Sequence, residues 1–186
     1  MTPLRSVTVY CGSSNDVDVA YLDLARRLGQ SIAARGLRLV YGGGGVGLMG
    51  QVAGAAHDAG AEVLGVMPQF LLHIEGTLGD IEHRMVDTMH ERKQILFDEA
   101  DAFIVLPGGI GTLEEAVETL SWAKLSLHSK PMAFLSEDGY WAPFFNLIDH
   151  IIAGGFAPAS FRRLIAETAS PEEALDALSA RFIALD

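Results

Sequence analysis

The sequence AFIVLPGGIGT, residues 102–112, contains the clearest strand of the chain and the loop that follows it. AFIVL is a short run of apolar residues, which is typical of a strand buried on both faces of a parallel sheet. The loop holds three glycines in four residues and leads into a helical pattern. A strand, a glycine-rich turn and a helix in this order form one unit of an α/β protein.

The same alternation of strand and helix continues on both sides of this unit. Further strands are expected at residues 6–10, 37–41, 62–67, 83–87, 131–135 and 164–167. Helices are expected at residues 19–35, 48–59, 112–127 and 140–152, with two more starting near residues 88 and 171, while residues 68–80 give mixed signals. Gly36 is expected to end the first helix, and Thr88 and Glu91 form a capping-box pattern at the start of the helix near residue 88. The pattern predicts parallel βαβ units, and therefore a doubly wound α/β sheet with helices on both faces. The length fits a single domain, residues 1–186.

The composition excludes several classes of protein. The chain has 13 Lys and Arg against 24 Asp and Glu, a formal charge of −11, which argues against a nucleic-acid partner. No run approaches the roughly 18 apolar residues that span a bilayer, so no membrane partner is expected. One cysteine, Cys11, excludes an internal disulfide, and the histidines lack HExxH spacing, so we expect no metal. We expect a cytoplasmic protein.

In a doubly wound sheet, ligands bind beyond the carboxyl ends of the strands. Three loops follow expected strands in this way: CGSS at residues 11–14, GGGGVGLMG at residues 42–50 and PGGIGT at residues 107–112. In the first loop, Ser13 and Ser14 either contact a phosphate or only turn the chain. Cys11 is either a nucleophile or, as we favour, a small packed residue.

The PGGIGT loop has the features of an anion site. Gly108, Gly109 and Gly111 allow backbone N–H groups to approach a phosphate at the start of a helix, where the helix dipole favours negative charge. Thr112 is expected to be the N-cap residue, since Thr112 and Glu115 form a capping-box pattern. The alternative is a tight turn with a capped helix, but three glycines exceed what a turn requires. We therefore expect this loop to bind phosphate.

Gly45, Gly47 and Gly50 match the GxGxxG fingerprint of dinucleotide-binding proteins. That fingerprint also requires an acidic residue at the end of the next strand, where this chain has VMPQ, residues 66–69. No Gly-Lys-Ser/Thr of a P-loop follows either glycine-rich loop. A mononucleotide therefore fits the sequence better than a dinucleotide or ATP.

Charged residues accompany these loops. Arg92 and Lys93 stand early in an expected helix, where positive charge opposes the helix dipole, and either they are solvated or Arg92 binds a phosphate or carboxylate. Glu115 is explained either as a capping residue or as a carboxylate for chemistry at a sugar carbon. Glu114 and Glu118 crowd the same helix despite their mutual repulsion.

Two of these motifs occur together at a specific spacing. PGGIGTLEE fits the pattern P-G-G-x-G-T-x-x-E, and Arg92 of MHERK precedes its last glutamate, Glu115, by 115 − 92 = 23 residues. With CGSS, YGGGGVGLMG and SWAKLSLHSKP, the chain resembles the Lonely Guy family, the cytokinin riboside 5′-monophosphate phosphoribohydrolases. The resemblance covers roughly residues 7–156. It departs from the usual W-A-Q-L-G at Lys124, and residues 76–87 match poorly.

The resemblance implies a Rossmann-like fold, a homodimer or larger homo-oligomer, and no cofactor. It implies hydrolysis of the N-glycosidic bond of a nucleoside 5′-monophosphate, adenosine or N6-substituted adenosine monophosphate, to the free base and ribose 5-phosphate. The implied catalytic pair is Arg92 and Glu115. Implied or expected substrate contacts are Ser13, Gly45, Glu75, Lys93, Gly108, Gly109, Gly111, Thr112, Glu114 and Ser121.

Other functions remain open from the sequence. A nucleotide-binding module without catalysis would need only the glycine-rich loops, although pure binding has no need of a carboxylate beside a phosphate. A nicotinamide oxidoreductase is disfavoured by the missing ribose carboxylate. Members of the family are often labelled lysine decarboxylases, but the chain has only three lysines and no recognisable pyridoxal-phosphate site.

Overall fold

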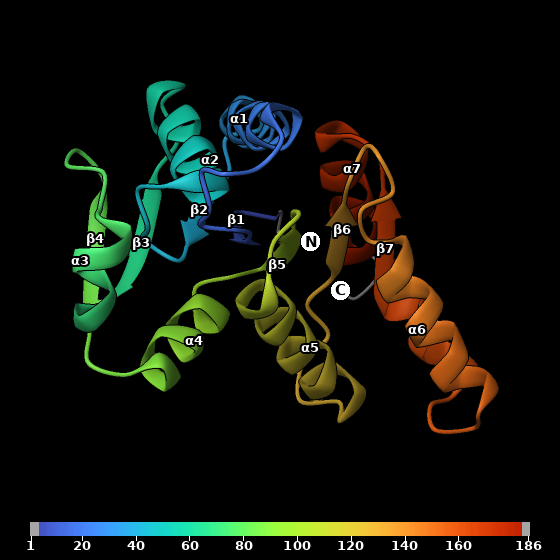
Figure 1. Cartoon of the computed structure of the whole chain (residues 1–186). Helices are drawn as coiled ribbons and strands as arrows, with labels where there is room; N and C mark the ends of the chain where they lie inside the picture. The colour runs from blue at the N-terminus through green and yellow to red at the C-terminus, as the bar shows by residue number, and fades with distance from the viewer. Residues whose placement is uncertain (1–3, 184–186) are drawn as a thin grey trace.

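The computed structural model describes residues 4–183, which form a seven-stranded parallel sheet with helices on both faces (Figure 1). The strands are β1 (Ser6–Tyr10), β2 (Arg38–Tyr41), β3 (Val63–Pro68), β4 (Glu82–Val86), β5 (Ala102–Val105), β6 (Met132–Leu135) and β7 (Ile165–Thr168). Their order across the sheet is β4-β3-β2-β1-β5-β6-β7. The predicted doubly wound α/β fold is confirmed.

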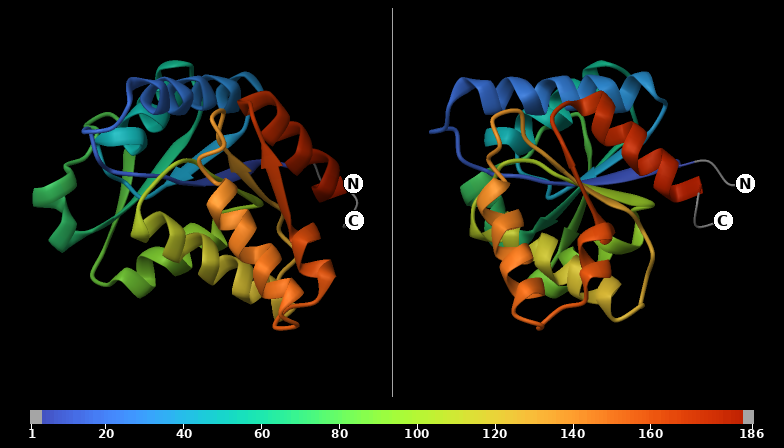
Figure 2. Two further views of the ribbon diagram at one scale, coloured as in Figure 1. Left: turned by 45° about the vertical axis from the view of Figure 1, so that its right-hand side comes forward. Right: turned by 90° about the vertical axis from the view of Figure 1, so that its right-hand side faces the viewer.

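The α-helices are α1 (Val19–Ala34), α2 (Gly47–Asp58), α3 (Leu72–Glu75), α4 (Met89–Asp98), α5 (Ile110–Lys124), α6 (Ala142–Ala153) and α7 (Pro171–Ile183). Two 3₁₀ segments, η1 (Gln69–Leu71) and η2 (Ala159–Leu164), complete the described elements. Helices α1, α2 and α7 cover one face of the sheet, and α4, α5 and α6 cover the other (Figure 2). Among the described residues, no helix is long and apolar enough to cross a membrane.

Strand β1 is the centre of the sheet and its topological switch point. The chain winds from β1 outward through β2, β3 and β4, and then returns to place β5 on the other side of β1. All pairings are parallel, so the carboxyl ends of β1, β2 and β5 meet at one edge. The three loops that the sequence analysis singled out therefore lie together at the place where doubly wound sheets bind ligands.

Local signals set most helix ends. Thr88 caps α4 with a complete capping box, in which Thr88 accepts from the Glu91 N–H and the Glu91 side chain accepts from the Thr88 N–H. Gly36 has a φ of 66° directly after α1, as expected for a glycine that ends a helix. Both ends agree with the sequence analysis.

The start of α5 differs from the expectation. The N-cap residue is Gly109, without a side-chain cap, and Thr112 lies inside the first helical turn. The expected capping box of Thr112 and Glu115 is therefore wrong, because the glycine-rich loop turns into the helix three residues earlier than the hydroxyl signal indicates. Capping no longer explains the glutamate at position 115.

Helices α1 and α2 pack closely because Gly29 has no side chain. A Cβ atom built on Gly29 would lie 2.4 Å from the Val52 carbonyl oxygen and 2.9 Å from the Ala56 nitrogen, both in the α2 backbone. Backbone atoms of a packed helix have little freedom to shift. This contact therefore requires glycine for packing, at a helical position where alanine is otherwise favoured.

We expect Gly29→Ala to lower the free energy of unfolding by about 1–3 kcal/mol, because the added methyl forces α1 and α2 apart. Gly54→Ala in α2 is the matched control, since its Cβ would meet only Leu78 Cδ1, at 3.9 Å. The control is expected to be stabilised by about 0.5–1 kcal/mol through its lower chain entropy. Urea denaturation of both variants measures the difference, and equal stability of the two would contradict this account of the packing.

Candidate active site

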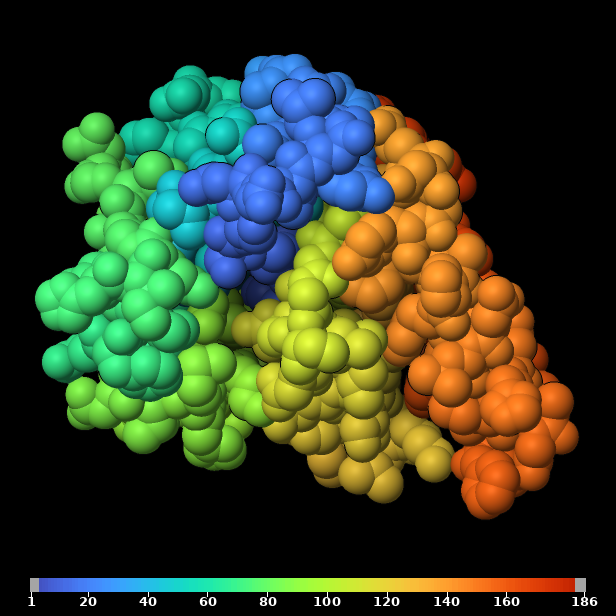
Figure 3. All heavy atoms as spheres, in the orientation of Figure 1, coloured from blue at the N-terminus to red at the C-terminus, as the bar shows by residue number. Residues whose placement is uncertain are grey.

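A cavity of about 320 Å³ opens at the carboxyl ends of β1, β2 and β5. In Figure 3 it is the central hollow where blue N-terminal atoms meet the yellow-green atoms at the start of α5. The lining residues come from all three predicted loops, from α3 and from α4: Val9, Cys11, Gly12, Ser13, Gly42, Met49, Glu75, Met89, Arg92, Gly109, Ile110, Gly111, Thr112, Glu114 and Glu115.

The two glycine-rich loops differ in whether their amide groups are available. At the start of α2, the Gly47 N–H donates to Asn15 Oδ1 at 2.8 Å and the Leu48 N–H donates to the Gly12 carbonyl at 3.0 Å. The Gly45 N–H likewise donates to carbonyls of residues 75 and 76. The amides at the start of α2 and that of Gly45 are thus used to hold neighbouring segments, and Gly45 lies outside the cavity lining.

The first amide groups of α5 are available to a ligand. Within residues 4–183, the N–H groups of Ile110 and Gly111 donate to no protein acceptor, and both residues line the cavity. Gly108, two residues before Ile110, is held by a hydrogen bond, since its carbonyl accepts from the Tyr140 hydroxyl at 2.9 Å. Open amides at a helix start form an anion site, so PGGIGT has the geometry of a phosphate cradle.

Arg92 is buried in the wall of this cavity, although it is charged. Its Nη2 atom donates to the Gly42 carbonyl at 2.9 Å, and its buried Nε atom has no hydrogen-bond partner within the described residues. A Cβ on Gly42 would lie 2.0 Å from that Nη2 atom, so only glycine leaves room for the guanidinium. The sequence analysis missed Gly42, although the run of four glycines after β2 is a signal for such a close approach.

Glu115 faces the same cavity from the second turn of α5. Burial raises the pKa of its carboxyl to about 7, against the opposing effect of the positive charges of Arg92 and Lys93. The negative charges of Glu114 and Glu75 push the pKa further upward. A carboxyl group with a pKa near neutrality in a cavity is a common property of catalytic residues.

Glu75 brings a further carboxylate to the cavity from the end of α3, beside those of Glu114 and Glu115 on α5. Its buried Oε2 atom has no hydrogen-bond partner within the described residues, which leaves it available to a ligand. Ser13 and Thr112 also line the cavity, and Thr112 packs against Gly108, where a Cβ would lie 2.2 Å from the threonine hydroxyl. Ser13, Glu75 and Thr112, which were expected to contact the substrate, therefore all lie at the cavity.

Lys93 and Ser121 lie outside the lining. The Lys93 ammonium is ion-paired with Glu114 at 2.6 Å and Glu118 at 3.0 Å, which ties α4 to α5 beside the cavity. Ser121 is exposed further along α5. Cys11 is buried and borders the cavity, and burial raises the pKa of its thiol, which favours the packed residue that the sequence analysis preferred over a nucleophile.

The raised pKa of Glu115 predicts a pH-dependent stability. Between an ordinary carboxyl pKa near 4.5 and about 7, the folded protein binds the extra proton, so its stability falls as the pH rises through this window. Glu115→Gln removes the buried charge and should raise the free energy of unfolding at pH 8 by up to about 3 kcal/mol, with no gain at pH 4. Thermal unfolding across this range measures the effect.

The matched control is Glu118→Gln, one turn further along α5. This variant loses an ion pair with Lys93, so at pH 8 it should be destabilised by about 0–1 kcal/mol. Equal gains at pH 4 and pH 8 for Glu115→Gln would show that its carboxyl titrates normally.

Comparisons with known proteins identify relatives of this chain. A family model described as "Possible lysine decarboxylase" matches residues 49–178. The cytokinin riboside 5′-monophosphate phosphoribohydrolase LOG of Oryza sativa subsp. japonica is 45% identical over 170 residues, covering 91% of this chain and 70% of that protein. LOG3 of Arabidopsis thaliana, named for the same activity, is 41% identical over 172 residues, covering 91% and 85%.

Solved structures share the fold at lower identity. A molybdenum cofactor carrier protein from Chlamydomonas reinhardtii superposes with a TM-score of 0.73 at 22% identity, covering 97% of this chain and 99% of that one. A molybdenum cofactor binding protein from Rippkaea orientalis has a TM-score of 0.68 at 22% identity, covering 97% of each chain. At this identity the likeness concerns the Rossmann-like fold alone.

Proposed function

We propose a function from the premise that this chain belongs to the Lonely Guy (LOG) family, the family of the cytokinin riboside 5′-monophosphate phosphoribohydrolases. It hydrolyses the N-glycosidic bond of an adenosine 5′-monophosphate, N6-substituted or plain, to the free base and ribose 5-phosphate. The observation that carries this proposal is the cavity in which the open amides of α5, Arg92 and the raised-pKa Glu115 meet. The relatives' names favour a hydrolase over a nucleotide-binding module, and over the decarboxylase of the family description.

The cavity provides a place for each part of the substrate. The 5′-phosphate accepts hydrogen bonds from the N–H groups of Ile110 and Gly111, and the adjacent Thr112 and Ser13 line the same region. The ribose then lies between this cradle and Glu115. The base lies against the apolar side chains of Met49 and Met89, which also line the cavity. This placement uses the residues that line the cavity, and leaves four expected contacts outside it: Gly45, Lys93, Gly108 and Ser121.

In the reaction, the electron pair of the C1′–N9 bond leaves with the base and a water oxygen bonds to C1′. The attacking water gives up one proton and the departing base takes up one, so that one water is consumed and neutral base is released. Positive charge develops on the ribose as the bond breaks, as in other glycosidic cleavages. The Glu115 carboxylate stabilises that charge and orients the water. Arg92 is always protonated, so it acts by hydrogen bonding, either to the phosphate or to the departing base.

Glu115→Gln tests the assignment of the catalytic carboxylate. We expect the release of free base from AMP and from isopentenyladenosine monophosphate to fall at least about a hundredfold, while nucleotide binding changes little. Chromatography measures the base, and Glu118→Gln, which does not line the cavity, is the control. Since the carboxylate is the active form, wild-type kcat/KM should fall as the pH drops below about 7. Turnover by Glu115→Gln at the wild-type rate would contradict the mechanism.

We further propose that the chain forms a homodimer through the exposed side of α5, and that it is cytoplasmic, as its single cysteine favours. Apolar side chains are exposed on α5 and directly after it: Ile110, Val117, Leu125 and Leu127. Ile110 and Val117 are seven residues apart and share a helical face. Exposed apolar groups in such number are typical of protein–protein contacts.

Val117→Asp should convert this dimer to a monomer, because a charge buried without a partner opposes association. Light scattering should give about twice 19.9 kDa for the wild type and about 19.9 kDa for the variant. Val19→Asp, at a more exposed valine at the start of α1 on the other face of the sheet (74% exposed against 46% for Val117), should leave the mass unchanged. A monomeric wild type would rule out the proposed dimer.

A further inference from the structure

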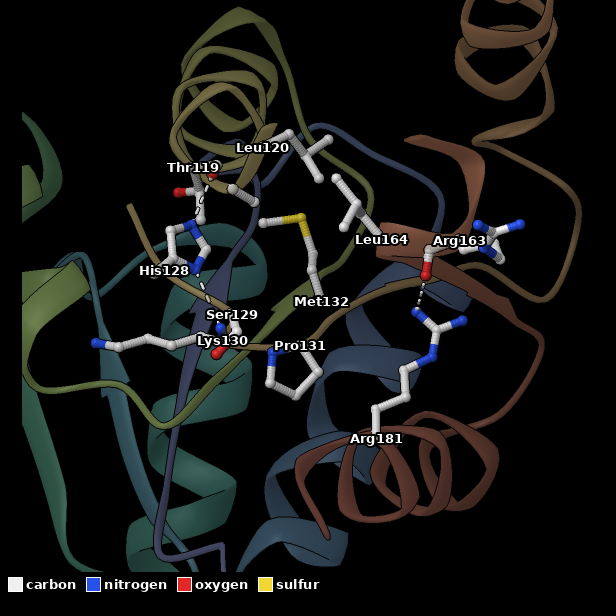
Figure 4. A pocket seen from close by; sticks show the side chains of 11 residues that line it. Thr119, Leu120, His128, Ser129, Lys130, Pro131, Met132, Arg163, Leu164 and Arg181 are labelled. Atoms are coloured by element: carbon white, nitrogen blue, oxygen red, sulfur yellow. Dashed lines mark hydrogen bonds between the residues drawn. The ribbon is translucent and has the colours of Figure 1, made fainter. Parts of the chain in front are cut away.

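A second cavity, of about 240 Å³, lies toward the opposite end of α5 from the candidate active site (Figure 4). Its walls come from the second half of α5, the segment that leads into β6, the end of η2 and α7: Thr119, Leu120, Ala123, His128, Ser129, Lys130, Pro131, Met132, Arg163, Leu164 and Arg181. From Gly111 to Ala123 the helix rises about 18 Å, and the two cavities share no lining residue. They are separate sites.

The interior of this cavity is mostly apolar. Leu120, Met132 and Leu164 face one another across it in Figure 4. His128 adds a ring without charge, because its Nε2 atom bonds to the Thr119 carbonyl at 2.9 Å and its Nδ1 atom accepts the Lys130 N–H at 3.1 Å. Burial also lowers the pKa of His128, which keeps the ring neutral. Any ligand must therefore have an apolar body.

The charged groups at the cavity are all basic. None of the lining residues is acidic, although the chain has 24 Asp and Glu. Within residues 4–183, no carboxylate forms an ion pair with Lys130, Arg163 or Arg181, whereas the neighbouring Arg162 pairs with two. The Lys130 ammonium points away, to the carbonyl and ring of Phe97. The guanidinium groups of Arg163 and Arg181 are therefore the positive charges available to a ligand.

Arg181 is weakly held in its present position. Its Nη1 and Nη2 atoms donate to the carbonyls of Arg163 and Ile165, both at 3.3 Å, which is longer than an ordinary hydrogen bond. Its partial burial and the nearby charge of Arg162 lower the pKa of the guanidinium, so its charge is poorly compensated. A carboxylate would be a stronger partner, because it matches the two-pronged geometry of the guanidinium.

We propose that this cavity binds a small amphipathic carboxylate. Its apolar body packs against Leu120, Met132 and Leu164, and its carboxylate pairs with Arg181, with Arg163 adding positive charge at the rim. The volume is below the roughly 300–1,000 Å³ of sites for drug-sized ligands, which limits the ligand to a short acid. This inference concerns a site apart from the proposed hydrolysis and does not depend on it.

Octanoate is the probe that tests the proposal, with octan-1-ol as the uncharged ligand of the same chain length. Isothermal titration of the full chain should show saturable octanoate binding, and octan-1-ol should bind at least about tenfold more weakly. Arg181→Gln should weaken octanoate binding by at least about tenfold. Arg162→Gln is the matched control, since Arg162 lies outside the lining, and it should change the affinity by less than about twofold.

A second variant tests the cavity without changing its charge. Ala123→Phe fills the space from α5 and should abolish binding of both ligands, with folding checked by thermal unfolding. In the Glu115→Gln variant, which is expected to bind AMP with little turnover, saturating AMP should leave octanoate binding unchanged, because the two sites are separate. Absence of saturable octanoate binding up to about 10 mM, equal binding to Arg181→Gln, or displacement by AMP would each overturn the proposal. None of these readouts uses turnover, so failure here is distinguishable from failure of the proposed hydrolysis.

Discussion

The parallel pairing of β1 with both β2 and β5 is the constraint on which the site depends. It places the carboxyl ends of three strands side by side, although the loops that follow them are separated by up to about a hundred residues of sequence. Gly12, Gly42 and Gly109 reach the same cavity from these three loops. At Gly42 a side chain would occupy the place of the Arg92 guanidinium, since a Cβ there would lie 2.0 Å from its Nη2 atom.

Backbone donors give the two glycine-rich loops different tasks. The first amides of α2 are used internally, on Asn15 and on the Gly12 carbonyl, and so tie α2 to the loop after β1. The loop before α5 keeps its amides open, while Tyr140 fixes its outer carbonyl. A glycine-rich sequence at a helix start is thus compatible with either a structural or a binding role, and only the partners of its N–H groups distinguish them.

The arginines of this acidic chain likewise fall into two groups, those in surface ion pairs and those without a carboxylate partner. Most arginines are paired with carboxylates on the surface, for example Arg38 with Glu62 and Glu99. Within the described residues Arg5, Arg92, Arg163 and Arg181 have no such pair, and of these Arg92 and Arg181 are the ones whose guanidinium groups we assign to a ligand. Desolvation makes an unneutralised cation costly, which is the physical reason for proposing an anionic ligand at each.

The sequence by itself determined the alternation of strands and helices, the capping of α4 by Thr88 and the three loops at the ligand-binding edge, because these depend on local periodicity and hydrogen bonding. The spacing of the two motifs also indicated Arg92 and Glu115 as the candidate catalytic pair. The tertiary structure decided that Gly109 rather than Thr112 begins α5, that Lys93 is tied to Glu114 and Glu118, and that Gly42 holds Arg92. These features arise from contacts between residues far apart in the chain, for which short-range patterns carry no signal. The raised pKa of Glu115 has the same origin, since burial and neighbouring charges exist only once the sheet has brought the loops together.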